Sequence, residues 1–206
     1  MKISVLELGP LGTNCYVCSE GNKAVAIDPG GDPAEVLDLL RNEHLELTHI
    51  LVTHLHCDHI YGCKALAQAT NATVLASPDD TFLLQTEVGA GGLFGLPKVE
   101  KFDFSAIKPG THEFLGHECR VLATPGHTPG SLTFYFPDQG RAFVGDLLFR
   151  RSVGRTDFPG GSTPALTESV QKEIFTLPEN TVIHSGHGPD TTVGDEKNHN
   201  PFFVGF

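Results

Sequence analysis

Apolar residues alternate in short runs at the start of the chain and later recur at helical spacing. Runs of period two between glycine and proline turns predict strands, and apolar residues every three to four positions predict helices. The predicted strands are 2–8, 13–19, 23–28, 48–53, 72–76, four or five between 102 and 144, and 181–184. The predicted helices are 33–43 (capped by Asp32), 60–69, a short one after Ser77-Pro78, and 164–175. Strands followed by helices, repeated along the chain, predict an α/β protein with two packed sheets and helices outside.

A glycine-rich segment, 88–98, interrupts this pattern and carries Leu93, Phe94 and Leu96 among its glycines. Long loops of this kind often cover a functional site. Two interpretations stay open: a mobile lid, or a surface loop packed by its own apolar side chains.

Length and charge narrow the class of protein. The 206 residues fit one domain that buries its own core. A net charge of -11 argues against a nucleic-acid partner, because phosphate binding relies on lysine and arginine. Ser4 and Glu7 interrupt the first apolar run, so no signal core is predicted, and no run approaches the roughly 20 apolar residues of a membrane span. A cytoplasmic location without membrane association follows by default.

The five cysteines are an odd number, and without a leader they are expected to be reduced. Cys15 and Cys18 form a C-x-x-C pair, a spacing known from redox and zinc sites. The pair lies in a predicted strand, where side chains three apart point to opposite faces. We therefore expect these two cysteines to be structural.

The segment from His54 to His59 carries the strongest chemical signal, with three histidines and one aspartate directly after an apolar strand. His54 and His56 are two residues apart, so an extended backbone sends both side chains to one side. The following helix re-aims Asp58 and His59. Imidazole and carboxylate ligands suit zinc and iron, and such a segment can present them to two neighbouring metal ions.

Three further ligand candidates follow predicted strands, next to glycines that allow tight turns. They are His127, Asp146 and His187. Together with the first segment they supply enough ligands for two ions. The other histidines are interpreted as structural or exposed, although His184 precedes a candidate ligand and could support it.

These residues in this order resemble the metallo-β-lactamase superfamily over essentially the whole chain. Shorter segments resemble the glyoxalase II-like branch, the hydroxyacylglutathione hydrolases: Thr13-Asn14-Cys15-Tyr16, Thr124-Pro125-Gly126-His127-Thr128-Pro129-Gly130, Gly145-Asp146 and Gly186-His187-Gly188-Pro189. The resemblance implies a four-layer αββα sandwich. It also implies a first metal ion on His54, His56 and His127, a second on Asp58, His59 and His187, and Asp146 bridging both. Two divalent ions are expected, zinc first, with iron or manganese as alternatives.

The resemblance implies hydrolysis of a thioester such as S-lactoylglutathione by a water activated between the two ions. Asp58 would move the proton, and Arg155 would either hold a substrate carboxylate or form an ion pair with Asp157. Only a short segment follows His187, so residues 1–206 are expected to form one domain without the C-terminal helical domain of full-length glyoxalase II. Gly188-Pro189 also stands where those enzymes have a tyrosine, which leaves the substrate open.

Other functions remain open at this point. Segments 154–158 and 174–178 resemble persulfide dioxygenases, which share the fold and use one iron at the positions of His54, His127 and Asp146. Lactone, other ester and β-lactam hydrolysis are alternatives within the hydrolase class. A metal-binding regulator without activity is the third reading, although all seven ligands are present. The expected partner is a small molecule, and the sequence predicts no oligomeric state.

Overall fold

The computed structural model describes residues 1–92 and 95–204. The chain divides into two compact units, Met1–Ile107 with Phe114–Gly116, and Lys108–Glu113 with His117–Phe206. Leu93 and Phe94 of the predicted lid lie outside the described residues. The expectation that 1–206 make one domain stays a prediction.

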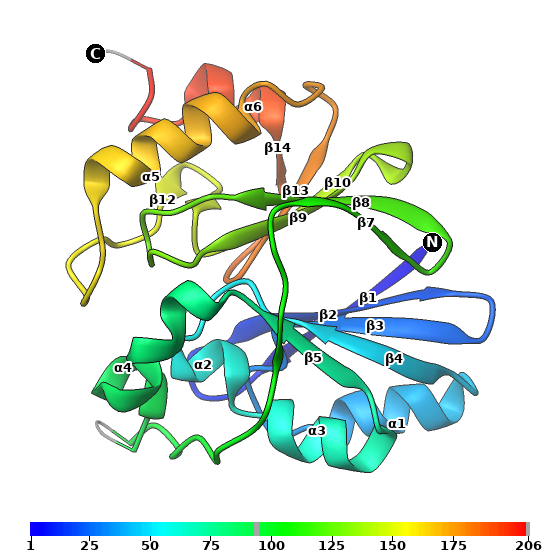
Figure 1. Cartoon of the computed structure of the whole chain (residues 1–206). Helices are drawn as coiled ribbons and strands as arrows, with labels where there is room; N and C mark the ends of the chain where they lie inside the picture. Colours follow the sequence, from blue (N-terminus) through cyan, green and yellow to red (C-terminus); the bar gives the residue numbers. More distant parts are fainter. Residues whose placement is uncertain (93–94, 205–206) are drawn as a thin grey trace. The chain divides into compact units, whose positions relative to one another are not determined.

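The first unit is built on a six-stranded sheet in the order β1-β2-β3-β4-β5-β6 (Figure 1). The first three strands are antiparallel neighbours, and the pairs from β3 to β6 are parallel. Parallel neighbours need crossover connections, and each of the three here contains helix. The strands are β1 (Lys2–Leu8), β2 (Thr13–Glu20), β3 (Lys23–Ile27), β4 (Glu46–Leu51), β5 (Thr73–Ala76) and β6 (Ser105–Ala106); the helices are α1 (Ala34–Asn42), α2 (Cys57–Ile60), α3 (Cys63–Thr70), the 3₁₀ helix η1 (Pro78–Gln85) and α4 (Glu87–Ala90).

Helices α1 and α3 cover one face of this sheet (Figure 1). Val36 and Leu40 of α1 and Leu66 of α3 are buried in one apolar cluster with inward-facing strand residues such as Ile50 and Val74. Each fully buried aliphatic side chain contributes roughly 1.5–3 kcal/mol relative to exposure. This cluster fixes strand β4, whose end delivers the histidine segment.

The second unit contains a six-stranded sheet in the order β14-β13-β10-β9-β8-β7 and a separate two-stranded hairpin, β11-β12. In the sheet, β10 and β13 are parallel, whereas β8–β9, β9–β10 and β13–β14 are antiparallel. The elements are β7 (Gly110–Phe114), β8 (His117–Ala123), β9 (Leu132–Phe136), η2 (Pro137–Gln139), β10 (Arg141–Gly145), β11 (Leu148–Phe149), β12 (Ser152–Val153), α5 (Thr163–Ser169), the π-helical turn η3 (Val170–Ile174), β13 (Val182–Ser185), β14 (Thr191–Thr192) and α6 (Val193–His199).

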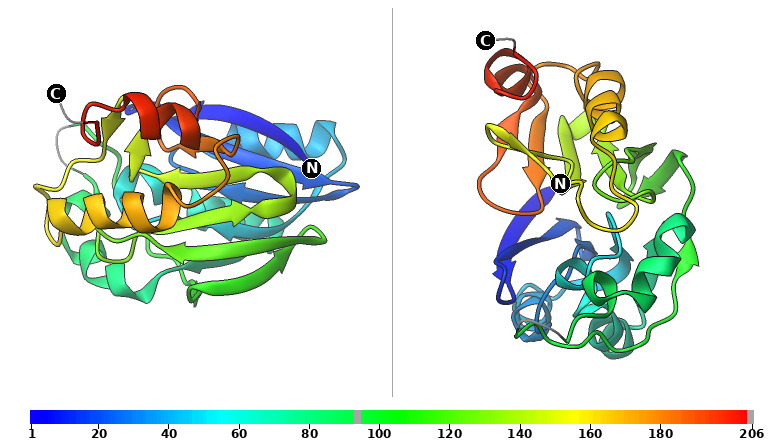
Figure 2. Two further views of the ribbon diagram at one scale, coloured as in Figure 1. Left: turned by 90° about the horizontal axis from the view of Figure 1, so that it is seen from above. Right: turned by 90° about the vertical axis from the view of Figure 1, so that its left-hand side faces the viewer.

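Helices α5 and α6 pack on one face of the second sheet, as Figures 1 and 2 show. Leu166 of α5 and Val193 of α6 share an apolar cluster with Ala142, Val144 and Ile183 of the strands. From the C-terminal segment, Phe203 packs edge-on against Phe175 with 5.0 Å between ring centroids. Residues 205–206 of this segment lie outside the described range.

A buried carboxylate ties α6 to the β11-β12 hairpin. The side chain of Glu196 is fully buried and accepts hydrogen bonds from the backbone N–H of Arg151 (2.8 Å) and from its guanidinium (2.7 Å). Thr191 Oγ1 and Asn200 Nδ2 donate to the same carboxylate at 2.6 and 2.9 Å. Asn200 Nδ2 also donates to the carbonyl of Ser152 at 3.0 Å. These contacts satisfy the charge that burial would otherwise penalise.

The predicted fold class is confirmed: the chain is a mixed α/β protein with two large sheets and covering helices. The predicted helix 60–69 is wrong at its start, because the chain forms α2 and then α3 with a break at Gly62. A side chain at Gly62 would meet the carbonyl oxygens of Gly31 and Pro29 at 2.5 and 2.8 Å, so this position stays bare. Elements β11, β12, β14 and α6 were not predicted. Among the described residues, no helix is long and apolar enough to cross a membrane.

Candidate metal centre

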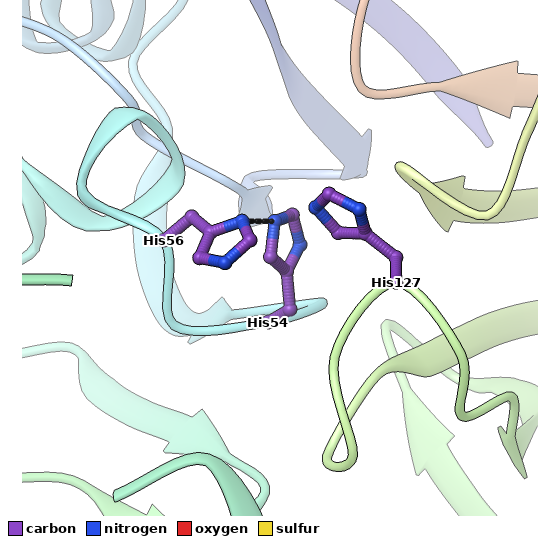
Figure 3. A group of neighbouring side chains, drawn as sticks. All are labelled: His54, His56 and His127. Atoms are coloured by element: carbon purple, nitrogen blue, oxygen red, sulfur yellow. Dashed lines mark hydrogen bonds between the residues drawn. The ribbon is translucent and has the colours of Figure 1, made fainter. Parts of the chain in front are cut away.

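His54 and His56 follow the end of β4 in an extended segment, and both side chains are buried. His54 Nε2 lies 3.1 Å from His56 Nδ1, the contact drawn in Figure 3. Zinc–nitrogen bonds of about 2.0–2.1 Å at a tetrahedral angle separate two ligand nitrogens by about 3.4 Å. The two nitrogens therefore already stand close to the separation that one metal ion requires.

Asp28, at the end of β3, orients two of the histidines. Its Oδ2 accepts a hydrogen bond from His59 Nδ1 at 2.9 Å and another from Thr53 Oγ1 at 2.6 Å. Because Thr53 Oγ1 donates its proton to Asp28, it accepts from His54 Nδ1 at 3.0 Å. Both imidazoles thus carry their proton on Nδ1, which makes Nε2 the coordinating nitrogen. Asp28 Oδ1 also accepts from the Thr53 N–H at 2.8 Å, so the carboxylate is held at both oxygens.

Asp58 and His59 lie in the short helix α2, where His59 is buried and Asp58 is partly exposed. His59 Nε2 stands 3.7 Å from Asp58 Oδ2, and Thr13 Oγ1 lies 3.5 Å from the same oxygen. The backbone of this helix runs close to Gly30, where an added Cβ would meet the Asp58 carbonyl oxygen at 1.7 Å. Glycine at that position is what lets α2 reach its place.

A second buried carboxylate holds the loop between His54 and His56. Asp80, in η1, is fully buried, and its Oδ2 accepts a hydrogen bond from the Leu55 N–H at 3.3 Å. This contact fixes the backbone from which both histidine side chains project.

The second unit contributes His127, Asp146 and His187, each after a strand or within a turn. His127, labelled in Figure 3, is buried, and its Nδ1 donates to the Arg155 carbonyl at 2.7 Å. Asp146 Oδ2 lies 3.7 Å from His127 Nε2 and 3.6 Å from His187 Nε2. One carboxylate oxygen therefore stands between two imidazoles, as a bridging ligand would.

Gly154 and Arg155 support this second set through the backbone. A Cβ on Gly154 would meet the Asp146 carbonyl oxygen at 1.8 Å and His127 Nδ1 at 3.3 Å. The Arg155 guanidinium makes two 2.7 Å hydrogen bonds to Asp157 and lies 3.8 Å from the centre of the Phe158 ring. This ion pair lowers the pKa of Asp157 to about 2. Of the two readings of Arg155, the structure shows the ion pair, and the substrate contact stays a prediction.

The donor set suits a transition metal. All seven predicted ligands are histidine or aspartate side chains, four in the first unit and three in the second. Imidazole and carboxylate donors, with second ring nitrogens fixed by carboxylate, hydroxyl or carbonyl groups, are typical of zinc and iron sites. The candidate ligands His54, His56, Asp58 and His59 lie in the first unit, and His127, Asp146 and His187 lie in the second.

The cysteines behave as structural residues. Cys15 and Cys18 are buried and free. Burial raises the pKa of Cys18 to about 12 and raises the pKa of Cys15 further. A thiol with such a pKa stays neutral at physiological pH and is a poor metal ligand or nucleophile.

Three supporting residues, Asp28, Thr53 and Asp80, were not predicted from the sequence. Asp28 stands directly after an apolar strand and before Pro29-Gly30-Gly31, the same position at a strand end that drew attention to Asp146. That signal was available for Asp28. Asp80 follows a proline in a short helix and carries no comparable signal.

Comparison with known proteins places the chain in a family. The family model described as the metallo-β-lactamase superfamily matches residues 8–187. The hydroxyacylglutathione hydrolase GloC of Haemophilus influenzae is 33% identical over 207 residues, covering 98% of each chain. The crystal structure of the BLEG-1 B3 metallo-β-lactamase is similar at 35% identity with a TM-score of 0.91, covering 99% of this chain and 100% of that one. The structure of TTHA1623 in a di-iron-bound form is similar at 37% identity with a TM-score of 0.88, covering 97% and 99%. The chain belongs to the metallo-β-lactamase superfamily, a superfamily of metallo-hydrolases.

Proposed function

We propose that this protein binds two divalent metal ions and hydrolyses a thioester of the S-lactoylglutathione type. The observation that carries the two-ion part is Asp28. This buried carboxylate fixes His59 directly and His54 through Thr53. In the family's pattern these two histidines belong to different metal ions, so one carboxylate orients a ligand of each.

The first ion would be held by His54, His56 and His127, and the second by Asp58, His59 and His187, with Asp146 bridging them. Zinc is proposed first, because tetrahedral nitrogen and carboxylate donors are its usual set. Iron and manganese accept the same donors, and a similar protein was crystallised in a di-iron-bound form.

Bound metal ions would lower the pKa of a coordinated water to about 7 and polarise the substrate carbonyl. Asp58 accepts the proton of the attacking water and delivers it to the leaving thiolate. Asp28 and the Arg155 carbonyl keep the imidazoles in one tautomer and one orientation during this transfer. The guanidinium of Arg155 exchanges its partner Asp157 for a substrate carboxylate.

The substrate class rests on the similarity to GloC, which covers almost all of both chains. The partner is therefore a small thioester, and glutathione thioesters come first. No macromolecular partner is proposed.

A specific observation also weighs against the one-iron alternative. A persulfide dioxygenase would use only the positions of His54, His127 and Asp146. His59 would then have no ion to bind, yet its Nδ1 is held at 2.9 Å by the buried Asp28. A two-ion hydrolase would use this arrangement, whereas a single ion on His54, His127 and Asp146 would not require it.

The test combines metal content with activity on protein purified without added metal. Two ions per chain by mass spectrometry and turnover of S-lactoylglutathione are expected. One iron per chain, no thioesterase activity and oxygen uptake with glutathione persulfide would overturn the proposal. Nitrocefin and a lactone complete the panel, since the similar BLEG-1 structure is named a B3 metallo-β-lactamase. Two ions with turnover of one of these substrates alone would overturn the thioester assignment.

A further inference from the structure

His187 lies at the tip of the β13-β14 hairpin. The two strands pair in antiparallel register, with Val182 opposite Thr192 and Ile183 opposite Thr191. One further step along that register places His184 opposite Asp190, at the point where the loop leaves the strands. The loop between them, 185–189, carries the candidate ligand.

His184 and Asp190 are joined by a hydrogen bond that closes this loop. His184 Nδ1 lies 2.9 Å from Asp190 Oδ1, and because a carboxylate accepts, the imidazole donates. The His184 ring is buried and stacks on Phe143 of β10, with 4.7 Å between ring centroids and 18° between planes. His184 therefore anchors the pair to the sheet, and Asp190 holds the segment that leads from the loop into β14.

The outgoing arm of the loop has its own anchors. Ser185 Oγ donates to the Leu148 carbonyl at 2.7 Å, and the Gly186 N–H donates to the Gly145 carbonyl at 2.8 Å. These bonds fix the backbone just before His187 to the strand end that carries Asp146. The His184–Asp190 bond fixes the backbone just after it, so His187 is held from both sides.

We propose that His184 and Asp190 act as a positioning pair for His187. This inference rests on the proposed two-ion function. His187 serves the second ion, together with Asp58 and His59, whereas the first ion depends on His54, His56 and His127. Breaking the pair is therefore expected to lower the affinity for the second ion and to leave the affinity for the first unchanged. Partners that hydrogen-bond a metal ligand directly are typically worth 10–100-fold in metal affinity, and we expect a loss within that range when the loop that carries His187 is released.

The test variant is Asp190→Asn, which keeps the size of the side chain and removes its charge. The chain offers a matched control in Asp138→Asn. Asp138 accepts from His117 Nδ1 at 2.5 Å in the same unit, and the two aspartates are similarly exposed, 48% for Asp138 and 45% for Asp190. The control pair ties a turn that carries no candidate ligand.

Each protein is loaded with zinc and titrated with a chelator, and bound metal is counted by mass spectrometry. Wild type and Asp138→Asn are expected to release the second ion at the same chelator concentration. Asp190→Asn is expected to release it at a 10–100-fold lower concentration while keeping the first ion. Cobalt-loaded protein provides a spectroscopic readout, in which only the bands of the second ion change.

Thermal unfolding of the metal-free proteins separates positioning from simple destabilisation. Equal midpoints for the two variants, together with selective loss of the second ion, support the proposal. Loss of both ions in parallel, or two ions held as tightly as in wild type, overturns the inference and leaves the proposed function standing. A wild-type chain that binds only one ion overturns the proposed function and this inference with it.

Discussion

Asp28, which orients two of the histidines, has an unusual backbone conformation. Its φ of 52° lies in the left-handed region, which few residues other than glycine, asparagine and aspartate tolerate. This conformation lets one buried carboxylate face Thr53 and His59 together. Aspartate is the acidic residue that combines a tolerated left-handed backbone with two acceptor oxygens.

Replacing Asp28 with asparagine tests this role. Oδ1 would still accept from the Thr53 N–H, so the amide NH₂ would replace Oδ2 and face the N–H of His59. Two donors would then oppose each other, and metal affinity is expected to fall about 10–100-fold with the fold retained. Chelator titration measures the affinity. Asp38→Asn is the control, because Asp38 is exposed on α1 and forms an ion pair with Arg41 of the same helix. Unchanged affinity in Asp28→Asn would contradict the assignment.

Arg155 is expected to separate metal binding from substrate binding. Arg155→Ala keeps the backbone carbonyl that fixes His127, so metal content should match wild type. It removes the guanidinium, so the KM for S-lactoylglutathione should rise several-fold with kcat nearly unchanged. An exposed ion pair contributes only about 0–1 kcal/mol, so stability should change little. Steady-state kinetics decide the matter, and an unchanged KM would leave Arg155 with the ion pair alone.

At this scale the sequence indicated candidate ligands more readily than the residues that support them. His54, His56, Asp58 and His59 are neighbours in the chain, so their spacing alone indicated a shared task. The support from Asp28 comes from a residue that is brought beside them only by the pairing of β3 with β4. Contacts of that kind depend on strand register, which periodicity does not supply.

Among the elements, α6 acts as a brace for the β11-β12 hairpin. The hairpin follows Asp146 and precedes Gly154 and Arg155, the residues that surround His127. Glu196 of α6 accepts hydrogen bonds from the backbone N–H and the guanidinium of Arg151, which lies between the two strands of the hairpin. A helix distant from the ligands in sequence therefore fixes the segment on which two of them depend.

Glu196→Ala is expected to destabilise the protein by about 3 kcal/mol, because it leaves donors around a buried site without their acceptor. For a chain of this size such a loss lowers the unfolding midpoint by roughly 6–12 °C. Differential scanning calorimetry measures it. Glu168→Ala provides the comparison: Glu168 forms an exposed pair with Lys172 in α5 and η3, and its removal should stay within about 1 kcal/mol. Equal midpoints for the two variants would refute the brace.

Elements with an apolar stripe were the predictable ones. Helix α1 was predicted within one residue at each end, because Val36 and Leu40 face the core. Its N-cap is Pro33 and not the predicted Asp32, although Asp32 Oδ1 accepts a hydrogen bond from the Ala34 N–H. Helix α6 was not predicted, because polar contacts of Glu196 and Asn200 hold it more than an apolar face does. The predicted helix is interrupted at Gly62, because the N–H of this residue donates to the Pro29 carbonyl at 2.8 Å instead of continuing the hydrogen bonding of α2.

The stability of the whole molecule is expected to depend on metal, because the chain carries a net charge of -11 and several candidate metal ligands. Metal ions that bind the folded chain and not the unfolded one add stability by mass action, about 2.7 kcal/mol at a hundred times the dissociation constant. Removing them should lower the unfolding midpoint by roughly 5–10 °C, and adding zinc back should restore it. Calorimetry of metal-free and reloaded protein tests this. An unfolding midpoint that does not change with metal would mean that the candidate ligands do not bind metal tightly.

The fold class could be predicted for the whole chain because the order of strands and helices and the family resemblance agreed. The division into two compact units could not be predicted. Amino-acid composition does not change between the two units. Within residues 107–117 the chain passes from the first unit to the second, back to the first and again to the second, and no polar linker marks the boundary.

The carbonyl oxygen that fixes His127 belongs to the backbone of Arg155, and every amino acid has such an oxygen. The exposed guanidinium of the same residue pairs with Asp157 and takes no part in fixing His127. Under the proposed function, a substitution at position 155 would change substrate selection while His127 keeps its tautomer. Selectivity can diverge here without rebuilding the chemistry.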